Sequence, residues 1–425
     1  MIDKEQSPDG ASPFKSKPVI GWVLYDWANS AFALTVIATF YPVFFRSYWS
    51  AGSDPAAITS RLALATAVGS ALVALIAPVL GAVADAGGAR KKFLSLFTLL
   101  AIASTLGLYF VAQGDWPVAL GLYVIALFGF YSANTFYDSL IINVTARENF
   151  ERVSAAGFGI GYLGSSMLLG FNVWMVSNPT ALGFADGSEA VRFAFALVAG
   201  WWALFSVPLF LFVREEKHES PPLLTAVVSG YRTLIGTFKN IREYKNLATF
   251  LLAYWLYIDG VHTLILMATD FGARLNFSSN DLVMALLVTN IVGVPATLAF
   301  GWLGGRIGPK RAIYLGVGVY LLIALWGLML ESVWQYYAMA IGVGLVQGGV
   351  QSMSRALYAR LTPPEKASEF FGFYSMLGKF AAILGPTLIG LLAMVSDNPK
   401  VSVLVLIPLF IGGLLLLSRV EVPDE

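Results

Sequence analysis

The chain of 425 residues has no cysteine, two histidines and few charged side chains. Without cysteine it can form no disulfide, thiolate metal site or cysteine nucleophile, and two histidines cannot build a histidine-rich metal site. Charged residues make up 12% of the sequence, about half of their share in an average soluble protein. So few charges cannot cover a soluble surface, and the net charge of +1 gives no basic field for nucleic acid. We expect a membrane protein that is not an enzyme and has no metal site, cofactor or nucleic-acid partner.

Long apolar runs fill the sequence instead, and hydrophobic residues make up 57% of it. A membrane-spanning helix needs about 20 apolar residues. Twelve runs of this kind are separated by charged clusters or by Gly, Pro and Asn turns: 19–45, 62–84, 93–112, 117–139, 153–176, 191–213, 247–269, 280–304, 312–330, 334–356, 370–395 and 401–418. The runs are too long for membrane β-strands and lack their alternation. An all-α membrane protein with twelve transmembrane helices is predicted.

The Lys and Arg residues of the loops fall mainly on one side of the predicted membrane. Because cytoplasmic loops are rich in these residues, both chain termini are predicted to lie in the cytoplasm. The spans divide six plus six around a polar connector, whose stretch Leu223–Phe238 has the pattern of an amphipathic helix at the membrane surface. The predicted parts are an N-terminal segment (1–17), a six-helix bundle (18–213), the connector (214–246), a second six-helix bundle (247–418) and a tail (419–425).

The two predicted bundles repeat each other weakly, in two places and each time at a constant spacing. The matching residues are Gly81, Gly88, Arg90 and Lys91 with Gly301, Gly308, Lys310 and Arg311, and Glu151, Ser154, Leu163 and Gly164 with Glu365, Ser368, Leu377 and Gly378. Both matches fall at equivalent helix ends. Such internal repeats are typical of secondary transporters, in which the substrate site lies between the repeats. We therefore expect two pseudo-symmetric halves with a small-molecule site between them.

Four of the predicted helices carry polar side chains within their apolar runs. They are Tyr25, Asp26 and Asn29 on the first helix, Asn134 and Asp138 on the fourth, Asp259 and His262 on the seventh, and Gln347, Gln351 and Arg355 on the tenth. Side chains three or four positions apart share one face of a helix. An ionisable group inside a membrane is costly, so it is a functional candidate by default. The alternative is a packed or capping carboxyl at Asp26 and Asp259, and a satisfied interior histidine at His262.

Four stretches of the sequence resemble the major facilitator superfamily of transporters. The loop GAVADAGGARKK (Gly81–Lys92) resembles the signature G-x-x-x-D-x-x-G-x-R-[KR] of that superfamily. Three further stretches resemble its vacuole effluxer-like branch: YDWANSAFALTV (Tyr25–Val36), LYIDGVHTL (Leu256–Leu264) and Gln347–Phe380. The resemblance covers nearly the whole chain. It implies two six-helix halves in which helices one, four, seven and ten surround a central cavity, and these helices carry the polar side chains.

The loop signature also assigns roles to three charged residues. By resemblance, Asp85, Arg90 and Lys91 form a latch that holds the halves together while the cavity faces outward. The second copy of the loop, GWLGGRIGPKR, has Gly305 at the position of Asp85. A complete latch is therefore expected in the first half of the chain.

Two ion pairs between helices follow as hypotheses. Asp259 and Lys379 lie at similar depth on the seventh and eleventh helices, which the resemblance makes neighbours; the pair is either mechanistic or static. Asp138 and Arg355 lie near the cytoplasmic ends of the fourth and tenth helices, at equivalent repeat positions. A gate salt bridge across the halves is predicted there, with two separately solvated charges as the alternative.

These observations predict a secondary active transporter that moves a small polar metabolite across the lipid bilayer by alternating access. The resemblance favours proton-coupled amino-acid efflux, and we expect a monomer in a bacterial inner membrane. The buried carboxylates are suited to binding an ammonium group or a proton. The alternatives are a symporter for peptide or sugar uptake and, from another class, a non-transporting membrane receptor or assembly partner.

Overall fold

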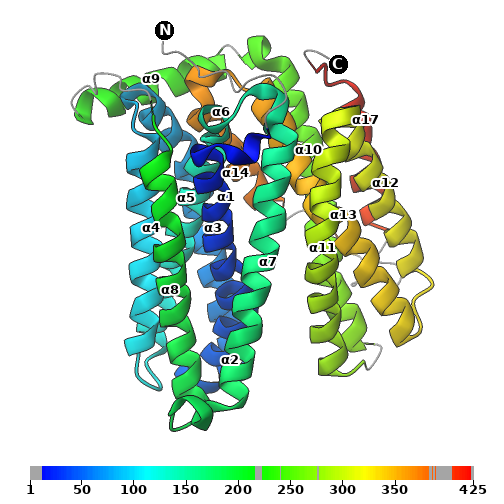
Figure 1. The fold of residues 1–425 in the computed structure, drawn as a ribbon. Helices are drawn as coiled ribbons and strands as arrows, with labels where there is room; N and C mark the ends of the chain where they lie inside the picture. Colours follow the sequence, from blue (N-terminus) through cyan, green and yellow to red (C-terminus); the bar gives the residue numbers. More distant parts are fainter. Residues whose placement is uncertain are drawn as a thin grey trace.

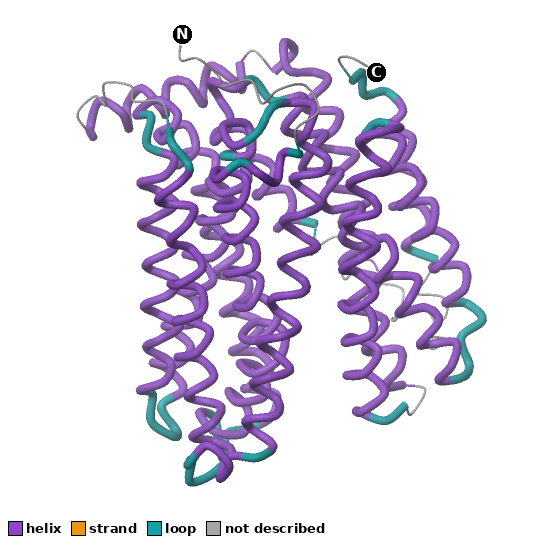
Figure 2. The backbone as a smooth tube through the Cα atoms, viewed as in Figure 1, coloured by secondary structure: helices purple, strands orange, loops and turns teal. Residues whose placement is uncertain are grey.

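The computed structural model describes residues 12–215, 223–239, 241–274, 277–381, 385, 388 and 404–422. Regular structure in these residues is helical, with no strand among them. The helices form two bundles that stand side by side, one running from α1 to α8 and the other from α10 to α17 (Figure 1 and Figure 2). The start of α1 and the end of α17 lie at the top of Figure 1, and we call this the terminal end of the molecule.

The helices of the two bundles have the following bounds. The first bundle contains α1 (Lys17–Ala31), α2 (Tyr41–Phe44), α3 (Pro55–Gly87), α4 (Arg90–Gly107), α5 (Trp116–Ser139), α6 (Ile141–Val144), α7 (Phe150–Ser177) and α8 (Gly187–Phe212). The second contains α10 (Lys245–Arg274), α11 (Ser279–Ile307), α12 (Pro309–Gly327), α13 (Val333–Leu361), α14 (Ala367–Phe380) and α17 (Leu406–Ser418). Two π-helical stretches, η2 (Phe32–Phe40) and η3 (Phe45–Trp49), continue the first span beyond α1.

Each predicted span contains a helix, so the all-helical membrane fold is confirmed. Nine helical segments in the described part of the chain are long and apolar enough to cross a membrane. Of the other three, α13 is long but contains Gln347, Gln351 and Arg355, whereas α14 and α17 are short within the described residues. Parts of the predicted spans 370–395 and 401–418 lie outside those residues. Twelve crossings and cytoplasmic termini therefore stay predictions.

A glycine with positive φ ends the second span of each bundle. Gly88 (φ 54°) follows α3, and Gly308 (φ 87°) follows α11. A residue with a side chain adopts this backbone region only at a cost, which favours glycine at both turns. The next helix, α4 or α12, begins within two residues. The two bundles therefore share a turn at the place where the sequence repeats.

The connector forms a helix, α9 (Leu223–Lys239), that lies across the terminal end (Figure 1). It packs closely on the first bundle, because a Cβ at Gly230 would lie 2.8 Å from the backbone nitrogen of Val83. It also contacts the second bundle, where Lys366 Nζ donates to Thr237 Oγ1 (3.2 Å) and to the Tyr244 hydroxyl (3.0 Å). Burial lowers the pKa of Lys366, but Tyr244 and the Glu369 carboxylate outweigh burial and raise it. The predicted amphipathic stretch is thus a helix that touches both halves.

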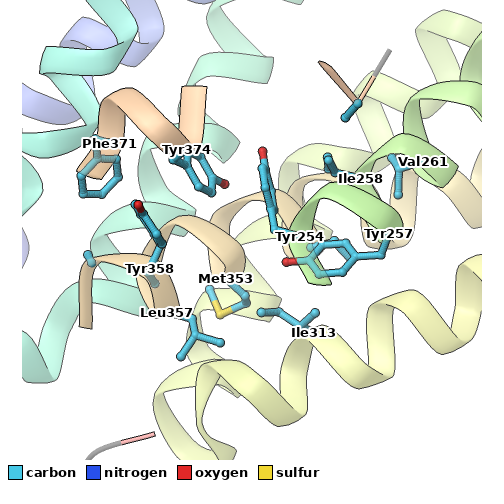
Figure 3. Packing of buried hydrophobic residues seen from close by; sticks show 14 of the residues in the cluster. Tyr254, Tyr257, Ile258, Val261, Ile313, Met353, Leu357, Tyr358, Phe371 and Tyr374 are labelled. Atoms are coloured by element: carbon cyan, nitrogen blue, oxygen red, sulfur yellow. The ribbon is translucent and has the colours of Figure 1, made fainter. Parts of the chain in front are cut away.

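Buried aromatic side chains hold α10, α13 and α14 together (Figure 3). The ring centroids of Tyr254 and Tyr374 lie 4.2 Å apart, and those of Tyr358 and Tyr374 lie 5.0 Å apart. The hydroxyls of these buried tyrosines need partners. Tyr257 shares a hydrogen bond of 2.7 Å with Ser354 Oγ, and Tyr358 donates to the Phe370 carbonyl at 2.6 Å. This packing fixes the part of α13 that carries Arg355.

Candidate functional site

A cavity of about 390 Å³ lies between the two bundles. Its polar lining comes from both halves: Asp26, Asn29, Ser30, Asn134, Tyr137, Asp138, Tyr162, Ser165, Thr289, Asn290, Tyr336, Gln347, Gln351 and Arg355. The lining begins at Asp138 and Arg355, toward the terminal end. It reaches Leu282 and Tyr336, in the first turns of α11 and α13, toward the opposite end.

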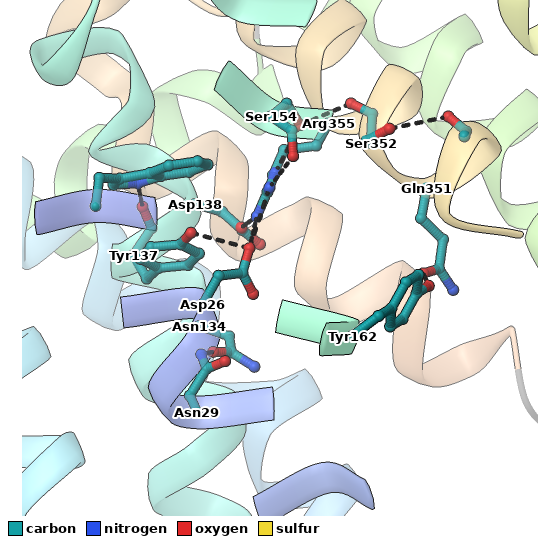
Figure 4. Close-up of polar contacts among 12 residues, drawn as sticks. Asp26, Asn29, Asn134, Tyr137, Asp138, Ser154, Tyr162, Gln351, Ser352 and Arg355 are labelled. Atoms are coloured by element: carbon teal, nitrogen blue, oxygen red, sulfur yellow. Dashed lines mark hydrogen bonds and ion pairs between the residues drawn. The ribbon is translucent and has the colours of Figure 1, made fainter. Parts of the chain in front are cut away.

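Arg355 lies between two carboxylates of the first bundle (Figure 4). Its NH1 donates to Asp138 Oδ1 at 2.8 Å, and both NH1 and NH2 lie 3.4 Å from Asp26 Oδ2. Asp26 Oδ2 also accepts from the Tyr137 hydroxyl at 3.0 Å. The remaining contacts of Arg355 go to Ser154 on α7, with Nε donating to Oγ and NH2 donating to the carbonyl, each at 2.9 Å. One buried guanidinium thus joins α1, α5 and α7 to α13.

Aromatic rings surround the same guanidinium. The Arg355 carbon Cζ lies 4.3 Å from the ring centroid of Phe158, 4.6 Å from that of Trp22 and 5.6 Å from that of Tyr137. An arginine over an aromatic face gains cation–π attraction, most strongly where water is excluded. Trp22 is held in place because its Nε1 donates to the Tyr137 carbonyl at 3.0 Å. The rings and carboxylates together restrict Arg355 to one position.

Amide side chains form the neighbouring wall of the cavity. Asn29 Nδ2 donates to Asn134 Oδ1 at 2.6 Å within the first bundle. The Tyr162 hydroxyl donates to Gln351 Oε1 at 3.0 Å, which connects α7 with α13. These groups present further donors and acceptors to the cavity (Figure 4). The wall is therefore suited to a polar ligand.

Beyond the cavity the halves meet along two seams near the terminal end. What we call the α14 seam joins α3 and α5 to η8 (Pro364–Lys366) and α14. Asp85 accepts from the backbone N–H groups of Ser368 (3.1 Å) and Glu369 (2.8 Å), at the N-terminus of α14. Arg90 is paired with Asp85 at 2.8 Å and donates to the Pro364 carbonyl at 2.8 Å. A carboxylate at a helix N-terminus satisfies free N–H groups and the positive end of the helix dipole.

Further along the α14 seam, the two halves are joined by hydrogen bonds between hydroxyl groups. Ser139 and Ser368 share a hydrogen bond of 3.3 Å between their Oγ atoms. Thr135 Oγ1 donates to Ser375 Oγ at 2.8 Å. Deeper still, Lys379 Nζ lies 3.1 Å from the ring centroid of Tyr131. Successive positions of α5 and α14 are thus linked by one polar contact each.

What we call the α13 seam consists of the Arg355 contacts with Asp26, Asp138 and Ser154, together with the other contacts between α7 and α13. Arg360 holds Glu151 through two hydrogen bonds, Nε to Oε1 at 2.6 Å and NH2 to Oε2 at 3.1 Å. Glu151 is fully buried. Such two-point arginine–carboxylate pairs are among the stronger hydrogen-bonded contacts in proteins. The α13 seam therefore depends on charged side chains from both halves.

Comparison with known proteins identifies this fold. The profile of the family "Vacuole effluxer Atg22 like" matches residues 51–144 and 143–424. The chain belongs to this family of the major facilitator superfamily. An uncharacterized MFS-type transporter of Bacillus subtilis, YxiO, is 36% identical over 408 residues, 95% of this chain and 94% of that protein. Autophagy-related protein 22 of Yarrowia lipolytica is 26% identical over 316 residues, 66% of this chain and 52% of that protein.

Solved structures agree on the fold of this Atg22-like transporter. The human organic anion transporter MFSD10 superposes with a TM-score of 0.70 at 16% identity, covering 94% of this chain and 99% of that one. The proton:xylose symporter XylE gives a TM-score of 0.68 at 12% identity, covering 96% and 95%. At these identities the likeness establishes the architecture alone. The chain is a multi-pass membrane protein, and its relatives are transporters rather than enzymes.

Most of the site residues predicted for this Atg22-like transporter lie where expected. Those that line the cavity are Asp26, Asn29, Asn134, Asp138, Gln347, Gln351 and Arg355. The predicted contact between Asp138 and Arg355 is present. Asp85 and Arg90 bridge the halves as the latch hypothesis requires. Lys91 does not, because its Nζ donates to the Phe210 and Val213 carbonyls in its own bundle.

Four other predicted cavity residues lie elsewhere. Tyr25 is fully buried and does not line the cavity, and its hydroxyl lies 2.6 Å from Thr98 Oγ1. Asp259, His262 and Lys379 are not among the described lining residues. The predicted Asp259–Lys379 ion pair is wrong for this structure. Asp259 Oδ2 accepts from the Gly385 N–H at 2.9 Å, and Lys379 extends instead to Tyr131 of the other half.

Several important residues escaped the sequence analysis. Tyr137 and Tyr162 contact the charged and amide groups of the cavity, but nothing in the sequence separates them from the other tyrosines. Glu151 and Ser154 belong to the repeat match, which was a usable signal for the α13 seam. Arg360, the partner of Glu151, lies five positions after Arg355 at the end of the same helix.

Proposed function

We propose that this protein is a secondary active transporter that exports amino acids from a bacterial cell in exchange for protons. The observation that carries the proposal is the position of the Arg355 contacts. They close the terminal end of a cavity whose lining runs toward the opposite end. Alternating access requires such a site between two halves, with one closed side and one open side.

The orientation, location and oligomeric state are part of the same proposal. The Lys and Arg residues of the loops favour a cytoplasmic terminal end. With that orientation, closed seams at the terminal end correspond to an outward-facing state in the bacterial plasma membrane. Both walls of the cavity come from one chain, which supports a monomer as the working unit. The description of the family as vacuole effluxers supports export as the direction.

The exchange of substrate for protons depends on the two carboxylates, Asp26 and Asp138, that contact Arg355. A proton from outside reaches Asp26 through the cavity, neutralises it and weakens its attraction to Arg355. The α13 seam then loses one of its charged contacts, which favours opening of the terminal end. A cationic group entering from the cytoplasm replaces the proton at Asp26, and the terminal end closes again. Asp26 is the proposed carrier of the proton, and Arg355 is the proposed sensor of its charge.

Proteoliposomes provide the test, because the direction of the proton gradient separates the possible functions. An acidic lumen should drive accumulation of radiolabelled amino acids if the protein exchanges them for protons. Asp26→Asn should abolish this uptake. Asp115→Asn should preserve it, because Asp115 is exposed at the start of α5 and makes no capping hydrogen bond. Uptake of xylose or a dipeptide driven by an acidic exterior would indicate symport instead. Movement of none of these pools would favour a receptor.

A further inference from the structure

We infer that the cavity selects an amphiphilic organic ammonium ion, which is held through its ammonium group at Asp26 and needs no carboxylate. This inference rests on the proposed transport function and names the substrate class for the same cavity. It includes apolar amino acids but extends to the corresponding amines. The argument depends on which charged groups of the cavity are already occupied.

The cation of the cavity is occupied on every side. An arginine has five N–H donors. In Arg355 they meet Ser154 Oγ, the Ser154 carbonyl, Asp138 Oδ1 and Asp26 Oδ2, the last through both terminal nitrogens. The rings of Trp22 and Phe158 cover the guanidinium within 4.6 Å. A ligand carboxylate would have to displace a buried carboxylate to reach this group, which carries a large penalty.

The anion of the cavity is only half occupied. Asp26 is 6% exposed, and its Oδ2 takes all of the hydrogen bonds recorded for its side chain in the described residues. Figure 4 shows the other oxygen pointing away from Arg355, into the space bordered by Asn134 and Tyr162. Because Asp26 lines the cavity, an ammonium group there can form a charge-assisted hydrogen bond with this oxygen. Asp26 Oδ1 is therefore the acceptor that the ligand reaches.

The charge balance of the lining points the same way. Two carboxylates, Asp26 and Asp138, face one guanidinium, and Arg355 is the one cationic side chain among the lining residues that the structure describes. One negative charge is left over. The amide wall, with Asn29, Asn134 and Gln351, supplies dipoles but no positive charge. A cation restores neutrality in this low-dielectric space, whereas an anion would add to the imbalance.

Apolar side chains make up much of the remaining lining, which also includes Thr289, Asn290 and Tyr336. Moving from Asp26 toward the opposite end, the ligand would meet Leu34, Phe130, Leu286, Met339 and Val343. Burial of an apolar substituent there contributes about 25 cal/mol per Å² removed from water. The cavity thus combines a negative end with apolar surface, and a few neutral polar side chains lie among the apolar ones. This pattern fits a ligand with an ammonium head and an apolar tail.

Three ligands of one carbon skeleton separate the contribution of each charge. They are leucine, 3-methylbutylamine, which lacks the carboxylate, and 4-methylpentanoate, which lacks the ammonium. Binding to the purified full-length protein is measured by calorimetry and by thermal stabilisation. We expect the dissociation constants of leucine and the amine to agree within tenfold, and that of 4-methylpentanoate to be at least 100-fold weaker. Asp26→Asn should weaken both ammonium ligands at least tenfold, and Asp115→Asn should leave them unchanged.

Each other outcome overturns the inference. If leucine binds and the amine does not, binding requires the carboxylate of the ligand, and a cation other than Arg355 must bind it. If 4-methylpentanoate binds, the site accepts an anion. If none of the three binds, the substrate class is wrong. The proteoliposome assay decides the transport function separately, because it follows other amino acids, a dipeptide and a sugar as well.

Discussion

The α13 seam and the α14 seam occupy corresponding places in the two halves of the molecule, but different chemistry holds them closed. In the α13 seam, side chains of opposite charge meet directly, as Glu151 meets Arg360. In the α14 seam, Asp85 binds backbone N–H groups, and the deeper contacts join hydroxyls, such as Thr135 and Ser375. The carboxylates that reach across both seams come from the first half. The helix ends of the two halves correspond, while their charges differ.

The difference has a structural cause at the end of the second span of each half. Asp85 in α3 has Gly305 as its counterpart in α11, so the second half offers no carboxylate to cap α7. Instead α11 packs tightly there, since a Cβ at Gly301 would collide with the Ala155 Cβ. The start of α7 is bound instead by two arginines of α13, because Arg355 contacts Ser154 and Arg360 contacts Glu151. Arg355 also lines the cavity, so the α13 seam exposes its charges to a ligand, whereas the described lining includes no charged side chain of the α14 seam.

The largest expected effect comes from removing the central charge of the α13 seam. Arg355→Gln leaves Asp26 and Asp138 buried without their cation. Breaking a buried ion pair from one side typically costs about 3–5 kcal/mol. We expect a loss of that size in thermal unfolding of the purified protein, together with loss of transport.

A triple variant separates charge from packing in that prediction. Asp26→Asn, Asp138→Asn and Arg355→Met together remove every charge of the cluster. Replacing a whole buried ionic group by neutral side chains is often close to neutral for stability. The triple variant should therefore be more stable than Arg355→Gln alone, while transport stays absent. A triple variant as unstable as the single one would show that packing, not charge, holds the α13 seam.

A smaller change tests how closely the cluster is packed. A Cβ at Gly157 would lie 2.6 Å from Asp26 Oδ2 and 3.0 Å from Arg355 NH2. Gly157→Ala should therefore push the two charges apart and cost about 1–3 kcal/mol, as overpacking typically does. Gly170→Ala, in the same helix, is the matched control because no atom lies within 4 Å of its added Cβ. Equal stability of the two variants would contradict the contact.

The α14 seam should respond more weakly to loss of its carboxylate. Asp85→Ala removes an acceptor for two N–H groups, and loss of such a cap costs about 0.5–2 kcal/mol. Asp85→Asn keeps one side-chain acceptor and should lose less. Arg90 keeps the Asn143 side chain and the Pro364 carbonyl as acceptors, which limits the damage.

Disulfide cross-linking measures directly whether the α14 seam is closed. The natural chain has no cysteine, so an introduced pair forms the cross-link without competition. Ser139→Cys with Ser368→Cys replaces two hydroxyls whose oxygens are 3.3 Å apart. Oxidation should join the halves and block transport, and reduction should restore it. In the Asp85→Ala background the cross-link should form several-fold more slowly, and Asp115→Ala should leave its rate unchanged. If the cross-linked protein still transports substrate, the α14 seam does not open during transport.

The sequence alone predicted much of this architecture, because apolar length and loop charge depend on local residues. The predicted span 117–139 differs from α5 (Trp116–Ser139) by one residue at its start. Apart from Tyr25, the polar residues predicted on the first, fourth and tenth helices line the cavity. Spacing of three or four residues tells which side chains share a face, but not which neighbour that face meets. For that reason Asp259 and His262 were assigned to the cavity wrongly.

The predicted ion pairs also show what sequence alone cannot determine. Depth along a helix can be counted at about 1.5 Å per residue, and this count was enough to match Asp138 with Arg355. It could not show that Asp26 approaches the same guanidinium from α1, because lateral position depends on how the helices pack. Depth also matched Asp259 with Lys379, and here the side chains turn to different partners.

The smallest expected effect concerns Lys379, whose contact with Tyr131 lies deepest in the α14 seam. Loss of a cation–π contact costs about 0.5–2 kcal/mol, and Lys379→Met should destabilise the protein by that amount. In double-mutant cycles measured by thermal unfolding, Lys379→Met should couple to Tyr131→Leu by a similar energy. It should add to Asp259→Asn within about 0.5 kcal/mol, as separate sites do. If instead Lys379→Met costs more than the Asp259→Asn/Lys379→Met double variant, the two residues form a buried pair, and the α14 seam is charged like the α13 seam.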